Sequence, residues 1–297
     1  MMLPFNETCF FCSMFNAGLF GLFRLMRVEL SFAAGICVLL AEVLARGGPP
    51  SALQALCGFL AAFFIAASVL VLNDCFDIET DRMNSPLRPL PAELVTCEVA
   101  VAFSAVLVLF GLFSAFLLGW QAFIVVAVLL LFGILYNWRI KRYGLAGNLM
   151  VAVTVGMTFI FGGVAVGNLS EPMVWFMAVM TLGVDLGEEI AADALDVEGD
   201  RRTGSHSLAV MFGSDRAMQV AAGVFGFVFS LGVIPFAFGW FDRVYLLPIV
   251  LFDVVVFHSV SRMLNPRIPD RITDIRRIYI AGTAMILVVT LMRLTIG

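Results

Sequence analysis

Nine long apolar stretches run through this chain of 297 residues, and each approaches the ~20 residues that a helix needs to cross a bilayer. They cover residues 30–46, 52–72, 95–118, 121–137, 145–167, 172–188, 217–239, 244–263 and 277–296. Of all residues 61% are hydrophobic and only 13% are charged, against about 25% charged in soluble domains. A soluble enzyme is therefore excluded, and the sequence predicts an all-α integral membrane protein with about nine transmembrane helices.

The basic residues predict how these helices are oriented. With nine spans, fifteen of the 18 Lys and Arg residues fall on the side that holds the N-terminus. Cytoplasmic loops carry such an excess of Lys and Arg. We therefore expect a multi-pass protein of the cell membrane whose basic side faces the cytoplasm.

The whole chain, 1–297, is predicted to form a single transmembrane domain. Residues 1–23 are apolar but lack the basic start and the cleavage site of a signal peptide. We interpret them as an interfacial N-terminal helix. The net charge of −4 gives no reason to expect a nucleic-acid partner, and no segment indicates an obligatory protein partner.

Half of the acidic residues gather in two short stretches. Of 22 Asp and Glu residues, four lie in 74–81 and seven lie in 185–200, at the cytoplasmic ends of the second and sixth spans. Three Asp residues in each stretch are spaced i, i+3 and i+7, which would place them on one face of a continuous helix. These are Asp74, Asp77 and Asp81 in the first stretch, and Asp193, Asp196 and Asp200 in the second.

Carboxylates stacked on one helix face repel each other, and the repulsion grows where the dielectric constant is low. A divalent cation would remove this repulsion. Oxygen ligands without Cys or His favour Mg²⁺ or Ca²⁺, and Mg²⁺ combines one or two carboxylates with waters and a substrate phosphate. Two facing stretches of this kind predict a pocket that holds Mg²⁺ and a diphosphate.

The first stretch reads Asn73-Asp74-x-x-Asp77-x-x-x-Asp81 and continues to Arg82 and Arg88-Pro-Leu-Pro. This run resembles a motif of the UbiA superfamily of intramembrane prenyltransferases. The segment from Asp193 to Asp200 is similar to the second motif of that family. Tyr136, Lys141 and Asn148 resemble residues at the end of its fourth span. Glu188 departs from the pattern, because many members have Arg at that position.

The resemblance implies nine helices around a central cavity with a cytoplasmic-side cap, and Mg²⁺-dependent transfer of a prenyl group from a prenyl diphosphate to a lipophilic acceptor. It implies metal ligation by Asn73, Asp77, Asp81, Asp196 and Asp200. It implies catalytic roles for Asp74, Asp77, Asp81, Asp193, Asp196, Asp200, Tyr136 and Lys141. It implies substrate contacts from Asn73, Arg27, Arg82, Arg88, Lys141, Arg202 and Asn148.

Within the family, Arg27-Val28-Glu29 is most similar to the archaeal digeranylgeranylglyceryl phosphate synthases. This similarity implies geranylgeranyl diphosphate as the donor and geranylgeranylglyceryl phosphate as the acceptor, in ether-lipid biosynthesis. An aromatic acceptor such as a hydroxybenzoate, a naphthoate or a chlorin remains the alternative, because a cavity of this kind would also hold one.

Two other functions use membrane carboxylates. A CDP-alcohol phosphotransferase needs Gly directly after its first DxxD, and here Ile78 follows Asp77. A divalent-cation transporter would carry its acids near the middle of the bilayer. The two acidic stretches instead lie at span ends on one side, which favours an enzyme with a cytoplasmic-facing active site.

Overall fold

A computed structural model describes residues 18–265 and 271–296, and every long element in these ranges is a helix. The long helices are α2 (Val28–Arg46), α3 (Ala52–Phe76), α5 (Cys97–Leu117), α6 (Trp120–Trp138), α7 (Leu145–Ala165), α8 (Pro172–Leu195), α11 (Ser214–Leu231), α13 (Leu246–Met263) and α14 (Arg271–Ile296). The short ones are α4 (Ile78–Asn84), η1 (Ile140–Tyr143), α9 (Val197–Thr203), α10 (Leu208–Phe212), α12 (Ile234–Ala237) and η2 (Arg243–Tyr245).

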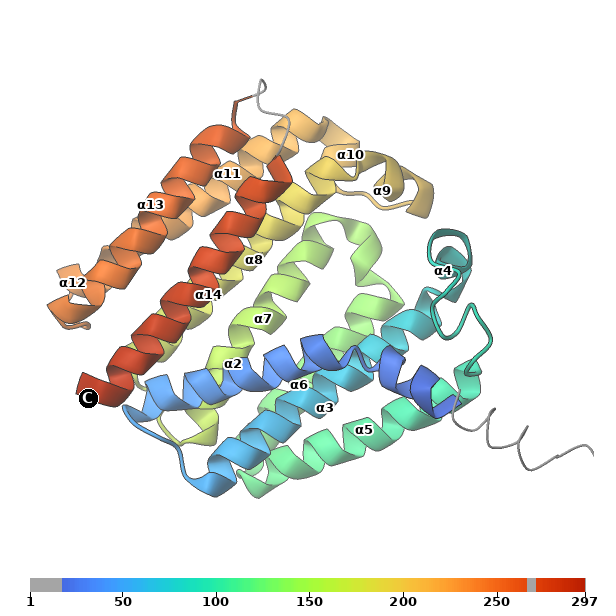
Figure 1. Cartoon of the computed structure of the whole chain (residues 1–297), viewed down its shortest axis with the longest axis horizontal. Helices are drawn as coiled ribbons and strands as arrows, with labels where there is room; N and C mark the ends of the chain where they lie inside the picture. Colours follow the sequence, from blue (N-terminus) through green and yellow to red (C-terminus); the bar gives the residue numbers. More distant parts are fainter. Residues whose placement is uncertain (1–17, 266–270, 297) are drawn as a thin grey trace, which may run out of the picture.

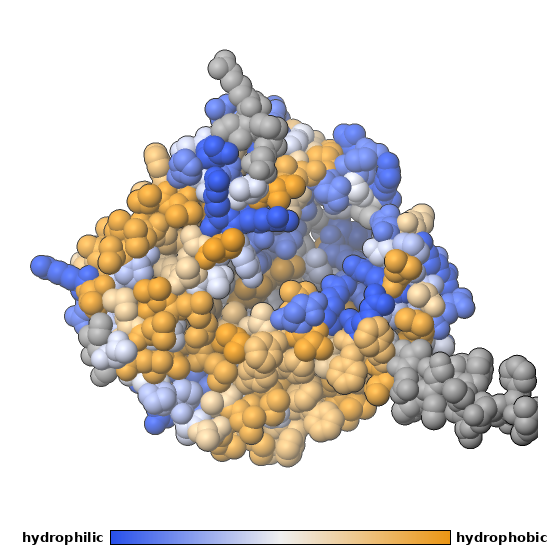
Figure 2. Space-filling model, viewed as in Figure 1, coloured by the Kyte–Doolittle hydropathy of each residue, from blue (hydrophilic) through white to orange (hydrophobic). Residues whose placement is uncertain are grey.

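Across the described ranges, nine helices reach 18 residues or more, which confirms the prediction of about nine spans. Eight of the spans are long and apolar enough to cross a membrane. The remaining helix, α8, has the length, but Asp185, Glu188 and Glu189 lie in its second half. The apolar sides of the molecule and its hydrophilic end are separated in Figure 2.

The long helices form a closed ring. Along the chain each long helix contacts a neighbour, in the order α2, α3, α5, α6, α7, α8, α11, α13 and α14, and α14 returns to contact α2 (Figure 1). The helix α2 also contacts α7 and α8 across the ring. Neighbours in the sequence are therefore neighbours in the ring, as is usual for consecutive elements, including those joined by the longer connections 77–96 and 196–213.

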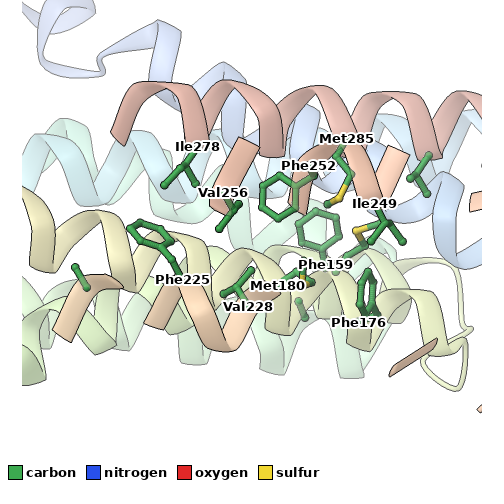
Figure 3. Packing of buried hydrophobic residues seen from close by; sticks show 14 of the residues in the cluster. Phe159, Phe176, Met180, Phe225, Val228, Ile249, Phe252, Val256, Ile278 and Met285 are labelled. Atoms are coloured by element: carbon green, nitrogen blue, oxygen red, sulfur yellow. The ribbon is translucent and has the colours of Figure 1, made fainter. Parts of the chain in front are cut away.

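Large apolar side chains fill one half of this ring. Val228 of α11 lies close to Met180 of α8, Phe225 of α11 packs further along α8, and Phe252 of α13 lies over Phe159 of α7 (Figure 3). All five side chains are almost completely buried. Burying a Phe side chain stabilises a soluble protein by about 1.5–3 kcal/mol, but in lipid close packing supplies most of the stabilisation.

The predicted N-terminal helix falls only partly within the described residues, since 1–17 lie outside them. Residues 18–25 are helical. Leu25 is buried beside Val71 of α3 and Leu107 of α5. This segment therefore packs on the helix ring, and its predicted interfacial position stays a prediction.

The prediction of a continuous helix through each acidic stretch was wrong. In the first stretch α3 ends at Phe76 and α4 begins at Ile78; in the second, α8 ends at Leu195 and α9 begins at Val197. The residue at each break is the middle Asp of the motif. Asp77 has φ −97° and ψ 4°, and Asp196 has φ −120° and ψ 41°, so neither is helical. Asp commonly starts a helix because its side chain accepts from free N–H groups in the first turn. Asp196 does so here with the Gly199 N–H, whereas the Asp77 side chain makes no such bond.

Candidate active site

The first acidic stretch forms a cluster of three carboxylates around the break between α3 and α4. Asp74 is in the last turn of α3, Asp77 is the residue at the break, and Asp81 is in α4. Asp74 and Asp81 are buried, with relative exposures of 3% and 6%. We call Asp74, Asp77 and Asp81 the first cluster.

A basic side chain pairs with each carboxylate of the first cluster. Lys141 Nζ forms an ion pair with Asp77 Oδ1. Arg27 Nη2 lies 2.5 Å from Asp74 Oδ1, and Arg88 Nη1 lies 2.6 Å from Asp81 Oδ2 and 3.6 Å from Asp74 Oδ1. These cations offset the desolvation and mutual repulsion of the carboxylates.

Arg27 reaches Asp74 from an unusual backbone conformation. Its φ is +42°, at the junction between the helical segment 18–25 and α2. For a residue other than Gly this conformation costs on the order of 1 kcal/mol and persists only where surrounding contacts impose it. The ion pair with the buried Asp74 is such a contact.

Asn73 is oriented by Asn137, a residue outside the motifs of the two acidic stretches. The Asn73 amide nitrogen donates to Asn137 Oδ1 over 2.8 Å, and Asn137 Nδ2 donates to the carbonyl of Val69 over 3.1 Å. Asn137 is 2% exposed. In the sequence, the feature that could have indicated Asn137 is its position as a polar residue next to Tyr136, at the end of an apolar span.

The second acidic stretch forms a second cluster of Asp193, Asp196 and Asp200. Asn148 Nδ2 donates to Asp193 Oδ2 over 2.8 Å, and the Gly199 N–H donates to Asp196 Oδ1 over 3.2 Å. Burial raises the pKa of Asp200, a hydrogen bond with Ser207 lowers it, and the charge of Asp196 raises it. Neutral donors thus supply these hydrogen bonds in the second cluster.

The link between α6 and α7 lies between the two clusters. Lys141 in η1 pairs with Asp77 of the first cluster, and the carbonyl of the next residue, Arg142, accepts from the His206 N–H just after α9. Tyr136 lies within range of the charges of Asp77 and Asp193. Both clusters are therefore at the same end of the ring, where Figure 1 shows α4 and α9, as the two matched spans predicted.

An apolar cavity of about 440 Å³ lies inside the ring below this end. Its wall comes from α2, α3, α6, α7, α8, α13 and α14. Leu70 and Gly133 line it one turn before Asn73 and Asn137. The volume falls within the ~300–1,000 Å³ of small-molecule sites. Figure 2 shows a hollow surrounded by hydrophilic side chains at this end.

Two predicted substrate contacts point elsewhere in the structure. Arg82 pairs with Glu79 at 2.9 Å on α4, and Arg202 pairs with Glu198 at 3.4 Å on α9. All four side chains are more than half exposed. Exposed ion pairs within one helix stabilise a protein by only a few tenths of a kcal/mol. The substrate roles of Arg82 and Arg202 stay predictions.

The side chains present fit Mg²⁺ by their chemistry, since both clusters offer carboxylate oxygens and Asn73 adds an amide oxygen. Within the described part of the chain, no three acidic, His or Cys side chains already form a group that could hold a metal ion. Lys141, Arg27 and Arg88 instead pair with the first cluster.

The sequence profile of the UbiA prenyltransferase family matches residues 34–281. Digeranylgeranylglyceryl phosphate synthase of Pyrococcus horikoshii is 30% identical over 245 residues, which are 82% of this chain and 87% of that protein. The synthase of Methanocaldococcus jannaschii is also 30% identical, over 82% of this chain and 84% of its own.

Solved structures agree with the fold. A structure described as giving insight into digeranylgeranylglyceryl phosphate synthase in membranes superposes with a TM-score of 0.79, at 28% identity, over 92% of this chain and 97% of that one. A UbiA homologue of Archaeoglobus fulgidus bound to GPP and Mg²⁺ superposes with a TM-score of 0.67, at 18% identity, over 90% and 97%. With nine long helices in a ring, two Asp clusters at one end and a family match over most of its length, the chain belongs to the UbiA prenyltransferase family of membrane enzymes.

Proposed function

We propose that this enzyme transfers a geranylgeranyl group from geranylgeranyl diphosphate to the free hydroxyl of geranylgeranylglyceryl phosphate, on the cytoplasmic side of the membrane. One observation carries the proposal: two carboxylate clusters, linked through η1, lie at the open end of an apolar cavity. This arrangement suits a molecule with a diphosphate head and a long apolar tail.

The residues proposed to hold Mg²⁺ are Asp77, Asp81, Asp196 and Asp200, with Asn73 as a neutral oxygen ligand. The bound ion would neutralise the diphosphate and favour its departure as a leaving group. The homologue structure bound to GPP and Mg²⁺ supports the metal dependence of the reaction.

The protein's own side chains have three roles in this scheme. Lys141, at the junction of the two clusters, supplies positive charge to the leaving diphosphate oxygens. Arg27 and Arg88 hold the first cluster in place and are proposed to contact the anionic heads of the substrates. The apolar cavity wall keeps water away from the allylic cation, which water would otherwise trap.

The acceptor is proposed from the similarity to synthases of this name, which covers most of both chains. The acceptor brings a second phosphate, and the basic residues at the cavity opening provide charges that complement it. The reaction forms a bond between the acceptor oxygen and C1 of the prenyl chain, and breaks the bond between C1 and the diphosphate.

The test uses the purified enzyme in lipid nanodiscs with labelled geranylgeranyl diphosphate and Mg²⁺. Geranylgeranylglyceryl phosphate, a hydroxybenzoate and a naphthoate are offered separately. We expect label in the digeranylgeranyl product, identified by mass spectrometry, and none when EDTA is present. Label only in an aromatic product would overturn the acceptor and leave the prenyltransferase assignment intact.

A further inference from the structure

Two acidic residues of α8 line the cavity itself, apart from both clusters. Asp185 and Glu188 are one turn apart and share the cavity wall with side chains such as Ile65, Val126, Phe159 and Met180. A carboxylate that faces an apolar cavity is costly unless it is protonated or meets a polar partner. Packing alone therefore does not explain why two carboxylates lie in this wall.

Close packing against α11 fixes the direction in which these acids point. A Cβ atom on Gly183 would lie 2.5 Å from Val228 Cγ2, and one on Gly187 would lie 2.7 Å from Phe225 Cε1, so glycine permits the contact. Successive residues of a helix are ~100° apart. Asp185, two residues from each glycine, lies on the opposite face of α8, toward the ring interior.

One oxygen of this pair lacks a partner. Asp185 Oδ2 is buried and has no hydrogen-bond partner among the residues that the structure describes. A buried acceptor left unpaired costs about 1–3 kcal/mol. A donor that enters the cavity with a ligand, such as an O–H group, would satisfy it.

The distance of the pair from the second cluster is suitable for contact with the reacting hydroxyl group. At 1.5 Å per residue, Glu188 and Asp185 lie roughly 8 and 12 Å along α8 from Asp193 of the second cluster. The diphosphate is proposed to sit at the clusters, so groups attached below it reach the level of the pair. Two carboxylates at this level would repel a phosphate but accept a hydrogen bond from a neutral hydroxyl.

We infer that the Asp185–Glu188 pair takes the proton from the hydroxyl group of the substrate that receives the prenyl group. This inference rests on the proposed function. The hydroxyl oxygen forms the new bond to C1 of the prenyl chain as the bond from C1 to the diphosphate breaks. The hydroxyl proton passes to one carboxylate of the pair, and the diphosphate leaves with the electrons of the broken bond. No further reactant is needed.

The titratable groups near the pair are few. Among the described residues they are Glu189 on α8, Tyr279 on α14 and Tyr136 on α6, and Cys37 on α2 lines the same cavity. Tyr279 lines the same cavity and lies within range of the charges of both acids.

The test compares Asp185→Asn, Glu188→Gln and the double variant with the wild-type enzyme, in nanodiscs with geranylgeranyl diphosphate, geranylgeranylglyceryl phosphate and Mg²⁺. Each variant keeps the shape of the side chain and removes its ability to take a proton. We expect kcat of the double variant to fall about 100-fold or more, with KM for the donor unchanged. We also expect the low-pH limb of the wild-type pH profile to disappear.

Asp215→Asn is the matched control, because Asp215 is an exposed acid at the start of α11. It should keep wild-type kcat and pH profile. A double variant that binds donor normally and retains the wild-type kcat and pH profile would overturn the inference. A loss of affinity for the donor as large as the loss of kcat would also overturn the inference, because the pair would then act in donor binding or in the fold. If wild-type enzyme prenylates only aromatic acceptors, the proposed function fails first, because no hydroxyl proton is then transferred.

Discussion

The two carboxylate clusters share one geometry and differ in the groups that neutralise them. In both, a long helix ends directly before the middle Asp and a seven-residue helix begins directly after it. In the first cluster Lys141, Arg27 and Arg88 pair with the carboxylates. In the second, Asp193 and Asp196 accept from the neutral Asn148 amide and the Gly199 N–H.

This difference indicates that the two clusters bind a metal ion under different conditions. A neutral donor leaves a carboxylate with its full charge, whereas an ion pair cancels most of it. A divalent cation that enters the second cluster gains electrostatic energy directly, while one that enters the first competes with Lys141 for Asp77. The second cluster should therefore bind metal without substrate, and the first should do so mainly with the diphosphate present.

The largest expected effect comes from removing the middle Asp of either cluster. Asp77→Asn and Asp196→Asn should each lower kcat by about 1,000-fold, because electrostatic stabilisation of the leaving group is lost. The assay is product formation at saturating Mg²⁺, with helix content and elution volume as checks on the fold. If only one of the two variants loses activity, the clusters do not share a metal-dependent role.

Removing Lys141 should have the next largest effect. Lys141→Met takes away the cation that pairs with Asp77 and should reduce kcat/KM for the prenyl diphosphate about 100-fold. Steady-state kinetics with varied donor concentration measures this. Arg142→Met is the control, since Arg142 is on the same turn, its side chain is exposed, and its carbonyl makes the contact to His206. A wild-type kcat/KM in Lys141→Met would make this lysine a determinant of orientation only.

The asparagines that support the two clusters allow a matched comparison. Asn148→Ala removes a hydrogen bond to a charged carboxylate. Asn137→Ala removes two neutral hydrogen bonds, one with Asn73 and one with the Val69 carbonyl, and only the first of these orients a residue of the site. Charged hydrogen bonds are worth about 1.5–3 kcal/mol and neutral ones about 0.5–1.5. We expect kcat/KM to fall roughly 10- to 100-fold in the first variant and a few-fold in the second. The reverse order would contradict the contrast between the clusters.

The smallest expected effect is stabilisation by Mg²⁺ alone. At ten times its dissociation constant, Mg²⁺ should stabilise the substrate-free protein by about 1.4 kcal/mol, measured as a rise in Tm in detergent. Asp77→Asn should keep this rise and Asp196→Asn should lose it. A rise lost in Asp77→Asn and kept in Asp196→Asn would assign the substrate-free metal site to the first cluster.

Much of the fold was predictable because it depends on runs of residues. The apolar stretches gave the number of long helices, and most helix ends lie within a few residues of the predicted spans. The span 172–188 was predicted too short, since α8 continues to Leu195 through Glu188, Glu189 and Asp193. Acidic residues usually end a membrane span, but here Glu188 faces the cavity and Asp193 bonds to Asn148 of α7.

The candidate site was predictable in its members but not in its contacts. Spacing alone brought Asp77 and Asp196 to matched helix ends, while their non-helical backbone conformations were missed, because i, i+3, i+7 spacing looks the same in a continuous helix. Asn137 was missed because one polar residue at a span end does not stand out from the interfacial residues around it.

The sequence by itself determined that the chain lies in a membrane, which side carries the basic loops, and where carboxylates gather, since each depends on residues close together in the chain. Only the tertiary structure decided that Lys141 meets Asp77, 64 positions away, and that Asp185 and Glu188 face the cavity. Such contacts depend on how each helix is rotated about its axis. For α8 that rotation is set by Gly183 and Gly187 against α11, an interaction between residues about 40 positions apart.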